Sequence, residues 1–127
     1  MPSQAKQKDL IAPQNTGLSE LRAALVESQQ RLRTLFDYAP EALVLLDVET
    51  GCFIDANPAA EKLFGLSRRE MTDKGPLDMS PSRQPDGCLS RDRAKQMIHE
   101  AVAGGTPMFE WWHCHANGEQ FPCEVRL

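Results

Sequence analysis

The stretch 55–71 limits most strongly what this chain can fold into, because it marks the boundaries of two short helices. Asn57, followed by a proline, is a favoured helix N-cap. Gly65 predicts the end of the first helix. Ser67 and Glu70 form a capping box, which predicts the start of a second helix. Helices this short cannot make a core alone, so they must cover another part of the molecule.

Hairpin signals lie on both sides of this stretch. Residues 42–47 form a short, continuously apolar segment that predicts a strand buried on both faces, and residues 52–55 pair back on it after a turn. Near the end of the chain, predicted strands over 107–114 and 119–127 flank Asn117-Gly118, which is a strong hairpin signal. The sequence therefore predicts two antiparallel hairpins.

The segment between the hairpins is predicted as a loop followed by a helix. Residues 73–89 contain several glycines and prolines, which favour a loop. Ser90 is predicted to cap a helix that runs to Ala103 and has apolar residues at helical spacing. The order of elements predicts the α+β class, with an antiparallel sheet and short helices on one face.

A leucine-rich helix is predicted upstream, over residues 18–37. Residues 1–17 are polar and are predicted to be disordered. The spacing of the leucines is typical of a coiled-coil seam, in which Ser28 is the polar position. The alternative is an amphipathic helix that packs on its own domain. Little neighbouring chain is available to its first part, so we favour a parallel dimer contact, with the interface residues Leu18, Leu21, Leu25, Leu32 and Leu35.

The stretch 55–71 resembles the signature of the PAS sensor domain, in which a strand leads through N-x-A-A-x-x-x-F-G into a short S-x-x-E helix. The resemblance covers roughly residues 32–127 and includes the Asn117-Gly118 hairpin and the F-P-x-E-V segment at 121–125. It implies a PAS domain over residues 38–127. The family has a fifth strand between the first and fourth, so we expect that this chain is a piece of a longer protein and lacks that strand and an output domain.

A PAS resemblance implies a sensory or regulatory module of bacterial-type signalling. Such a module binds a small ligand or a partner and transmits the signal through a dimer. The implied outputs are a histidine kinase, a cyclic-dinucleotide enzyme or a helix-turn-helix transcription regulator, and the residues do not choose among them. The alternative is a ligand-free dimerisation module, in which Trp111 and Phe121 fill the pocket.

The second hairpin determines which side chains face a ligand. Apolar and polar residues alternate along its last strand, so the apolar set faces the core. On the preceding strand, a slip of one residue in the turn would exchange the side chains that face inward with those that face outward. The set of side chains that includes Glu110 would make the poorer core. In the PAS family, the other set usually faces the cavity. The candidate ligand-binding residues are Phe109, Trp111, His113, Phe121, Cys123 and Val125, with Leu63, Met97 and Ile98 from the helices. His113 either hydrogen-bonds a ligand or is a satisfied core histidine.

The sequence favours neither a metal nor a cofactor. His and Cys residues gather between 113 and 123, but adjacent strand residues point to opposite faces and cannot easily share one ion. Haem in some PAS sensors is held by a histidine on the helix before the second hairpin, but His99 lies opposite the apolar face of that helix. Cys88 lacks the motif of covalent flavin photosensors. Haem and non-covalent flavin stay open as alternatives to a cofactor-free domain.

Composition and motifs narrow the functional classes further. The chain has 127 residues and a formal charge of −4, which gives no electrostatic footprint for nucleic acid or an anionic membrane. It shows neither a signal peptide nor an apolar stretch of membrane-spanning length, so we expect a cytoplasmic location. It contains no motif of a catalytic nucleophile, phosphate loop or zinc protease, so we expect no enzymatic activity in this chain.

Overall fold

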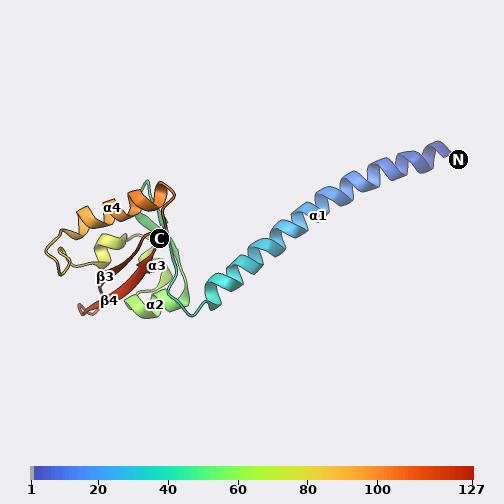
Figure 1. Cartoon of the computed structure of the whole chain (residues 1–127). Helices are drawn as coiled ribbons and strands as arrows, with labels where there is room; N and C mark the ends of the chain where they lie inside the picture. The colour runs from blue at the N-terminus through green and yellow to red at the C-terminus, as the bar shows by residue number, and fades with distance from the viewer. Residues whose placement is uncertain (1) are drawn as a thin grey trace. The chain divides into compact units, whose positions relative to one another are not determined.

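The computed structural model describes residues 2–127, with side chains from Gly17 onward. The chain divides into two units, Met1–Asp37 and Tyr38–Leu127, and the second unit carries both hairpins (Figure 1). In chain order the elements are α1 (Pro2–Tyr38), β1 (Val44–Asp47), β2 (Cys52–Ala56), α2 (Pro58–Phe64), α3 (Arg68–Met71), the 3-10 helix η1 (Pro76–Met79), α4 (Ser90–Val102), β3 (Met108–Cys114) and β4 (Gln120–Arg126). The α+β class expected from the sequence is confirmed.

Helix α1 begins at Pro2, earlier than the sequence pattern predicts. The expected disorder of residues 1–17 therefore differs from the backbone observed for residues 2–17, whereas the side chains of residues 1–16 lie outside the described residues. The five seam leucines are all exposed by more than half, from 54% at Leu18 to 70% at Leu21. They give α1 a row of uncovered apolar side chains within its own unit.

The buried side chain of Asn57 joins the start of α2 to the segment before β1. Its Oδ1 accepts a hydrogen bond from the backbone N–H of Ala60 at 2.9 Å, which is the expected N-cap bond. The same oxygen accepts from the N–H of Leu43 at 2.9 Å, and Nδ2 donates to the carbonyl of Glu41 at 2.9 Å. One side chain therefore fixes both a helix end and the path of the chain into β1.

The end of α2 is also as predicted. Gly65 lies at φ +72°, a left-handed conformation that favours glycine. A Cβ at this position would lie 2.2 Å from the ring of His115, in the turn between β3 and β4. The N–H of Ala116 donates to the carbonyl of Phe64 at 2.9 Å. Glycine at the helix end thus allows the turn of the second hairpin to lie directly against α2.

The apolar core lies between the first hairpin and the short helices. The capping box of Ser67 and Glu70 forms as predicted and starts α3, whose Met71 is fully buried. Burying a side chain of this size contributes about 1.5–3 kcal/mol. The core cluster consists of Phe53, Ala56, Ala60, Phe64, Met71 and Met79, with Leu46, Leu63, Leu66 and Phe121 half-buried around it. The short helices therefore cover the first hairpin, as the sequence requires of them.

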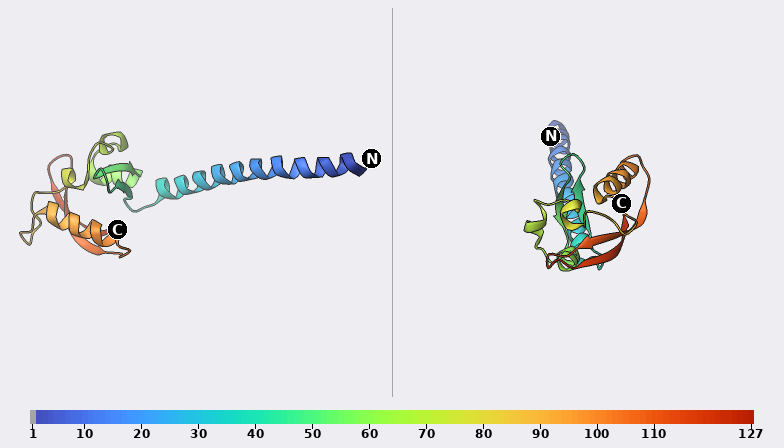
Figure 2. Two further views of the ribbon diagram at one scale, coloured as in Figure 1. Left: turned by 90° about the horizontal axis from the view of Figure 1, so that it is seen from above. Right: turned by 90° about the vertical axis from the view of Figure 1, so that its left-hand side faces the viewer.

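Strand β1 is more exposed than its apolar sequence predicts. Val44 and Leu45 expose 37% and 52% of their surface. Within the described chain, β1 pairs only with β2 and β3 only with β4, so the hairpins form two separate two-stranded sheets (Figure 2). β1 therefore has one open edge, and the expectation that it is buried on both faces is wrong for this chain.

Two details of the segment before α4 also differ from the expectation. The stretch 73–89 is not all loop, because it contains η1. Ser90 is the first residue of α4 rather than its cap, and Leu89 is at the N-cap position. The hydroxyl of Ser90 instead donates to the carbonyl of Pro81 and accepts from Nε2 of Gln84. Bonds to the preceding loop have replaced the local cap.

We expect Asn57→Ala to lower the free energy of unfolding by about 2–4 kcal/mol, because it removes a helix cap together with two partly buried hydrogen bonds. Urea denaturation of the purified chain measures this loss. Ser67→Ala is the matched control, because it removes an exposed cap that has no long-range partner, with an expected loss of about 1 kcal/mol. Equal losses in the two variants would contradict the role assigned to Asn57.

Candidate functional site

The register of the second hairpin places one set of side chains toward the helices. Trp111 pairs with Cys123, and His113 pairs with Phe121. Trp111 is buried, with 3% exposed, whereas Trp112 on the other face is half-buried. The orientation of β3 is therefore the one that the sequence favours. We call the side of the hairpin that carries Trp111 and His113 the inner face.

The indole of Trp111 is fixed between β3 and η1. Its Nε1 donates to the hydroxyl of Ser80 at 2.9 Å, and that hydroxyl donates to the carbonyl of Pro76 at 2.6 Å. The ring of Phe109 lies edge-on to the indole, with 5.9 Å between the ring centroids. Trp111 is thus a packed and hydrogen-bonded residue, rather than an open wall of a cavity.

The buried side chain of Gln84 binds β3 in the way that a neighbouring strand would. Its Oε1 accepts from the N–H of Trp112 at 2.9 Å, and its Nε2 lies 3.3 Å from the Trp112 carbonyl and 3.0 Å from the Ser90 hydroxyl. Sequence reasoning missed Gln84, because it stands in a segment rich in turn residues where a polar side chain is expected to face solvent. The adjacent Pro85 predicts a turn and does not indicate that Gln84 is buried.

The imidazole of His113 packs among aromatic rings on the inner face. The ring of Phe64 lies edge-on to it at 5.0 Å between centroids, and the ring of Phe121 lies at 5.7 Å. Burial lowers the pKa of His113 below its ordinary value of 6.5, and a hydrogen bond to the carbonyl of Met79 opposes this shift only in part. The ring is therefore held in its neutral form near neutral pH.

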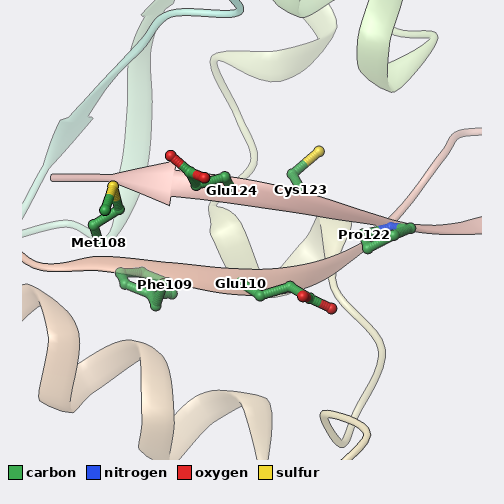
Figure 3. A pocket seen from close by; sticks show the side chains of 6 residues that line it. All are labelled: Met108, Phe109, Glu110, Pro122, Cys123 and Glu124. Carbon is green, nitrogen blue, oxygen red and sulfur yellow. The ribbon is translucent and has the colours of Figure 1, made fainter.

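An open concavity of about 430 Å³ lies along the β3–β4 hairpin (Figure 3). Two of the nine candidate residues, Phe109 and Cys123, contribute to it, and burial raises the pKa of the Cys123 thiol, which keeps it protonated. Glu110 and Glu124 face each other across the strands, and Arg126 pairs with Glu124 at 3.1 Å. The full lining is Met108, Phe109, Glu110, Pro122, Cys123 and Glu124.

The other candidate residues are not gathered around this concavity. Leu63 lies half-buried at the edge of the core cluster, and Met97 and Ile98 lie half-buried on α4. Val125 is half-buried on β4 opposite Phe109. The contact that sequence reasoning left out is Phe64, which joins α2 to His113 and Phe121.

Neither a metal cluster nor a membrane-spanning helix is found in the described part of the chain. Among residues 17–127, no three His, Cys, Asp or Glu side chains lie close enough together to hold a metal ion. Within the same residues, no helix is both long and apolar enough to cross a bilayer. His99, which occupies the helix that carries the haem ligand in some PAS sensors, is exposed on α4.

Comparisons with known proteins agree with this fold. A sensory-box histidine kinase/response regulator domain from Geobacter sulfurreducens is similar in structure, at 25% identity and a TM-score of 0.66, over 80% of this chain and 83% of that one. A PAS domain from Colwellia psychrerythraea matches at 22% identity and a TM-score of 0.62, over 76% of each chain. The PAS domain of an HTR-like protein from Haloarcula marismortui matches at 17% identity and a TM-score of 0.61, over 85% of this chain and 84% of that one.

The class defined by these features is a sensory-type α+β domain, as in the matched solved structures. A family model described as PAS domain matches residues 30–99, more than half of the chain. The chain belongs to the PAS domain family. PAS domains are generally sensory modules of signalling proteins and not catalysts, which fits a chain whose sequence shows no catalytic motif. The search of curated proteins found no matching relative.

We expect acid to destabilise the protein through His113. Because the pKa of His113 is lower in the folded protein than in the unfolded chain, the unfolded chain binds the proton more readily below about pH 6.5. The free energy of unfolding should keep its full value above pH 6.5, fall as the pH drops below it, and level off once the folded His113 also titrates.

Urea denaturation at pH values from 8 to 5 measures this dependence, as the difference between the wild type and His113→Phe. The subtraction removes the contribution of the carboxylates, which both proteins share. His99→Gln is the control, because His99 is exposed and the variant should retain the wild-type slope. A His113→Phe variant with an unchanged slope would contradict the assignment.

Proposed function

We propose that this chain is a sensory PAS module that binds a small ligand at the inner face of the β3–β4 hairpin. The observation that carries the proposal is the composition of that face. It combines half-buried apolar side chains with one half-buried imidazole. Binding sites for small molecules are typically apolar surfaces of this kind with few polar groups. The location we propose is the cytoplasm.

Ligand binding signals only if it favours one of two packing states of the domain. The inner face contacts α2 through Phe64, and it contacts η1 through Ser80 and Met79. A ligand that displaces a side chain on this face therefore changes the packing of the short helices. We propose this displacement as the first step of the signal.

We propose that the signal passes through a homodimer formed by α1. The support is the row of seam leucines, which are more than half exposed along the described part of α1. Helices without a partner are marginally stable in water, and a second copy of α1 would cover these side chains. A parallel pair would place two PAS domains at equivalent positions and connect them to a shared output.

We propose that the signal passes from the PAS domain to an output domain. The similar domain from Geobacter sulfurreducens comes from a sensory-box histidine kinase/response regulator, which supports a histidine kinase output for this chain. A cyclic-dinucleotide enzyme and a helix-turn-helix transcription regulator are the other two outputs that a PAS module commonly serves.

The second candidate function is a dimerisation module without a ligand. The observation that favours it is Trp111, which is 3% exposed and hydrogen-bonded to Ser80. A face filled by its own side chains has no room for a ligand. In that case α1 would carry the function of the chain alone.

Native mass spectrometry of the freshly purified chain, with an absorbance spectrum, tests the sensor proposal. We expect a small molecule that copurifies in a fixed ratio, because the inner face offers apolar contacts. A haem or flavin spectrum would replace this expectation with a cofactor-based sensor. A ligand-free dimer would favour the second candidate function.

A double variant, Leu21→Glu with Leu25→Glu, separates the two functions. We expect its dimer dissociation constant to rise at least about 10-fold, because charged side chains would replace exposed leucines in the proposed seam. Analytical ultracentrifugation measures the association, and a sensor should retain ligand binding as a monomer. Ala23→Glu with Gln30→Glu is the control, because these positions lie opposite the seam. Equal association in both variants would place the dimer contact elsewhere.

A further inference from the structure

The imidazole of His113 has one ring nitrogen without a protein partner. The carbonyl of Met79 is the backbone acceptor that acts on the ring, because it raises the pKa of His113 against the effect of burial. Among the described residues no group bonds Nδ1, which is closed off from solvent. Because Nδ1 has no partner, we assign the contact with Met79 to Nε2, which then carries the proton since a carbonyl only accepts. Nδ1 then presents a free lone pair, and buried polar atoms are normally hydrogen-bonded.

The surroundings of His113 keep this lone pair available. The rings of Phe64 from α2 and Phe121 from β4 both pack against the imidazole, the first edge-on and the second tilted. The nearby titratable side chains on the packed elements are engaged in other bonds. Nδ1 of His115 accepts from the Asn117 N–H, a Glu61 oxygen accepts from the Arg68 N–H, and an Asp78 oxygen accepts from the Gly75 N–H. Burial is the main cause of the lowered pKa, so the ring stays neutral and accepting near pH 7.

The geometry points to Nδ1 of His113 as the atom that selects the ligand of this face, an uncharged small molecule with an apolar body and one N–H or O–H donor. This inference rests on the proposed function, because it assigns a ligand class to the same face. A cation would be desolvated among aromatic rings, and an anion would find no free donor on this imidazole. A donor without charge satisfies the lone pair and keeps the apolar contacts.

Phe121 is the side chain that such a ligand would displace. It is half-buried, it pairs with His113 across the strands, and its ring lies 5.7 Å from the imidazole between centroids. The buried Phe64 lies edge-on to the imidazole at 5.0 Å between centroids and belongs to the core, so it is the fixed side of the contact. The ligand's apolar body would take the place of Phe121 against Phe64.

Pyrrole and furan are a matched pair of probes for this selection. The two rings have nearly the same size, and only pyrrole has an N–H donor. Each probe is titrated into the purified chain, which is labelled with ¹⁵N at histidine. Binding is measured from long-range ¹H–¹⁵N NMR spectra of the imidazoles at pH 7.5. We expect pyrrole to bind about 5- to 100-fold more tightly than furan, because one buried hydrogen bond strengthens binding by about this factor. Pyrrole should also shift the Nδ1 signal of His113 selectively.

His113→Phe removes the acceptor and keeps a ring in its place, so the preference for pyrrole should disappear. Phe121→Leu is the second variant, because it retains His113 and opens room beside it. It should bind pyrrole more tightly than the wild type does, with the preference over furan kept. If His113→Phe does not fold, Phe121→Leu and the Nδ1 signal still test the inference.

The outcomes separate the two proposals. Equal binding of pyrrole and furan would overturn the selection by Nδ1 and leave the ligand-binding face standing. Binding of neither probe, in the wild type and in Phe121→Leu, would overturn both and indicate a buried water at Nδ1. A preference for pyrrole that persists in His113→Phe would assign the acceptor to another group and overturn the inference.

Discussion

The buried amide of Asn57 is the interaction on which the PAS unit depends. Its oxygen serves two backbone N–H groups, one that begins α2 and one that lies just before β1, and its nitrogen holds a carbonyl at Glu41. Because Leu43 and Glu41 are 14 and 16 residues distant from Asn57 along the chain, the side chain converts a local helix signal into a tertiary constraint. The core cluster of the first hairpin and the short helices packs next to this junction between α2 and the segment before β1.

The second hairpin is attached to the rest of the PAS unit by side-chain contacts rather than by a continuous sheet. Trp111 bonds Ser80, His113 packs on Phe64, and the turn after β3 lies against Gly65. These contacts join the hairpin to two segments of the chain between the two hairpins, the end of α2 and the end of η1. A change at the inner face therefore reaches α2 and η1 directly, which is the arrangement that a sensory module requires.

The sequence predicted what is local and missed what is long-range. The caps at Asn57 and Ser67 were predicted because each acts within one helical turn. Ser90 has the same residue type, but its hydroxyl is engaged by Pro81 and Gln84, which the sequence does not reveal. For the candidate site, alternation in β4 and Glu110 in β3 predicted the inner face. The free nitrogen of His113 depends on Met79 and could not be predicted.

The amide of Gln84 has a consequence for how the chain behaves among other chains. It occupies the N–H and carbonyl of Trp112 on the edge of β3 that faces away from β4. Open strand edges can pair with strands of other molecules and start aggregation, and natural proteins block them. A single glutamine side chain therefore blocks edge-to-edge association at the middle of β3, in a sheet of two strands.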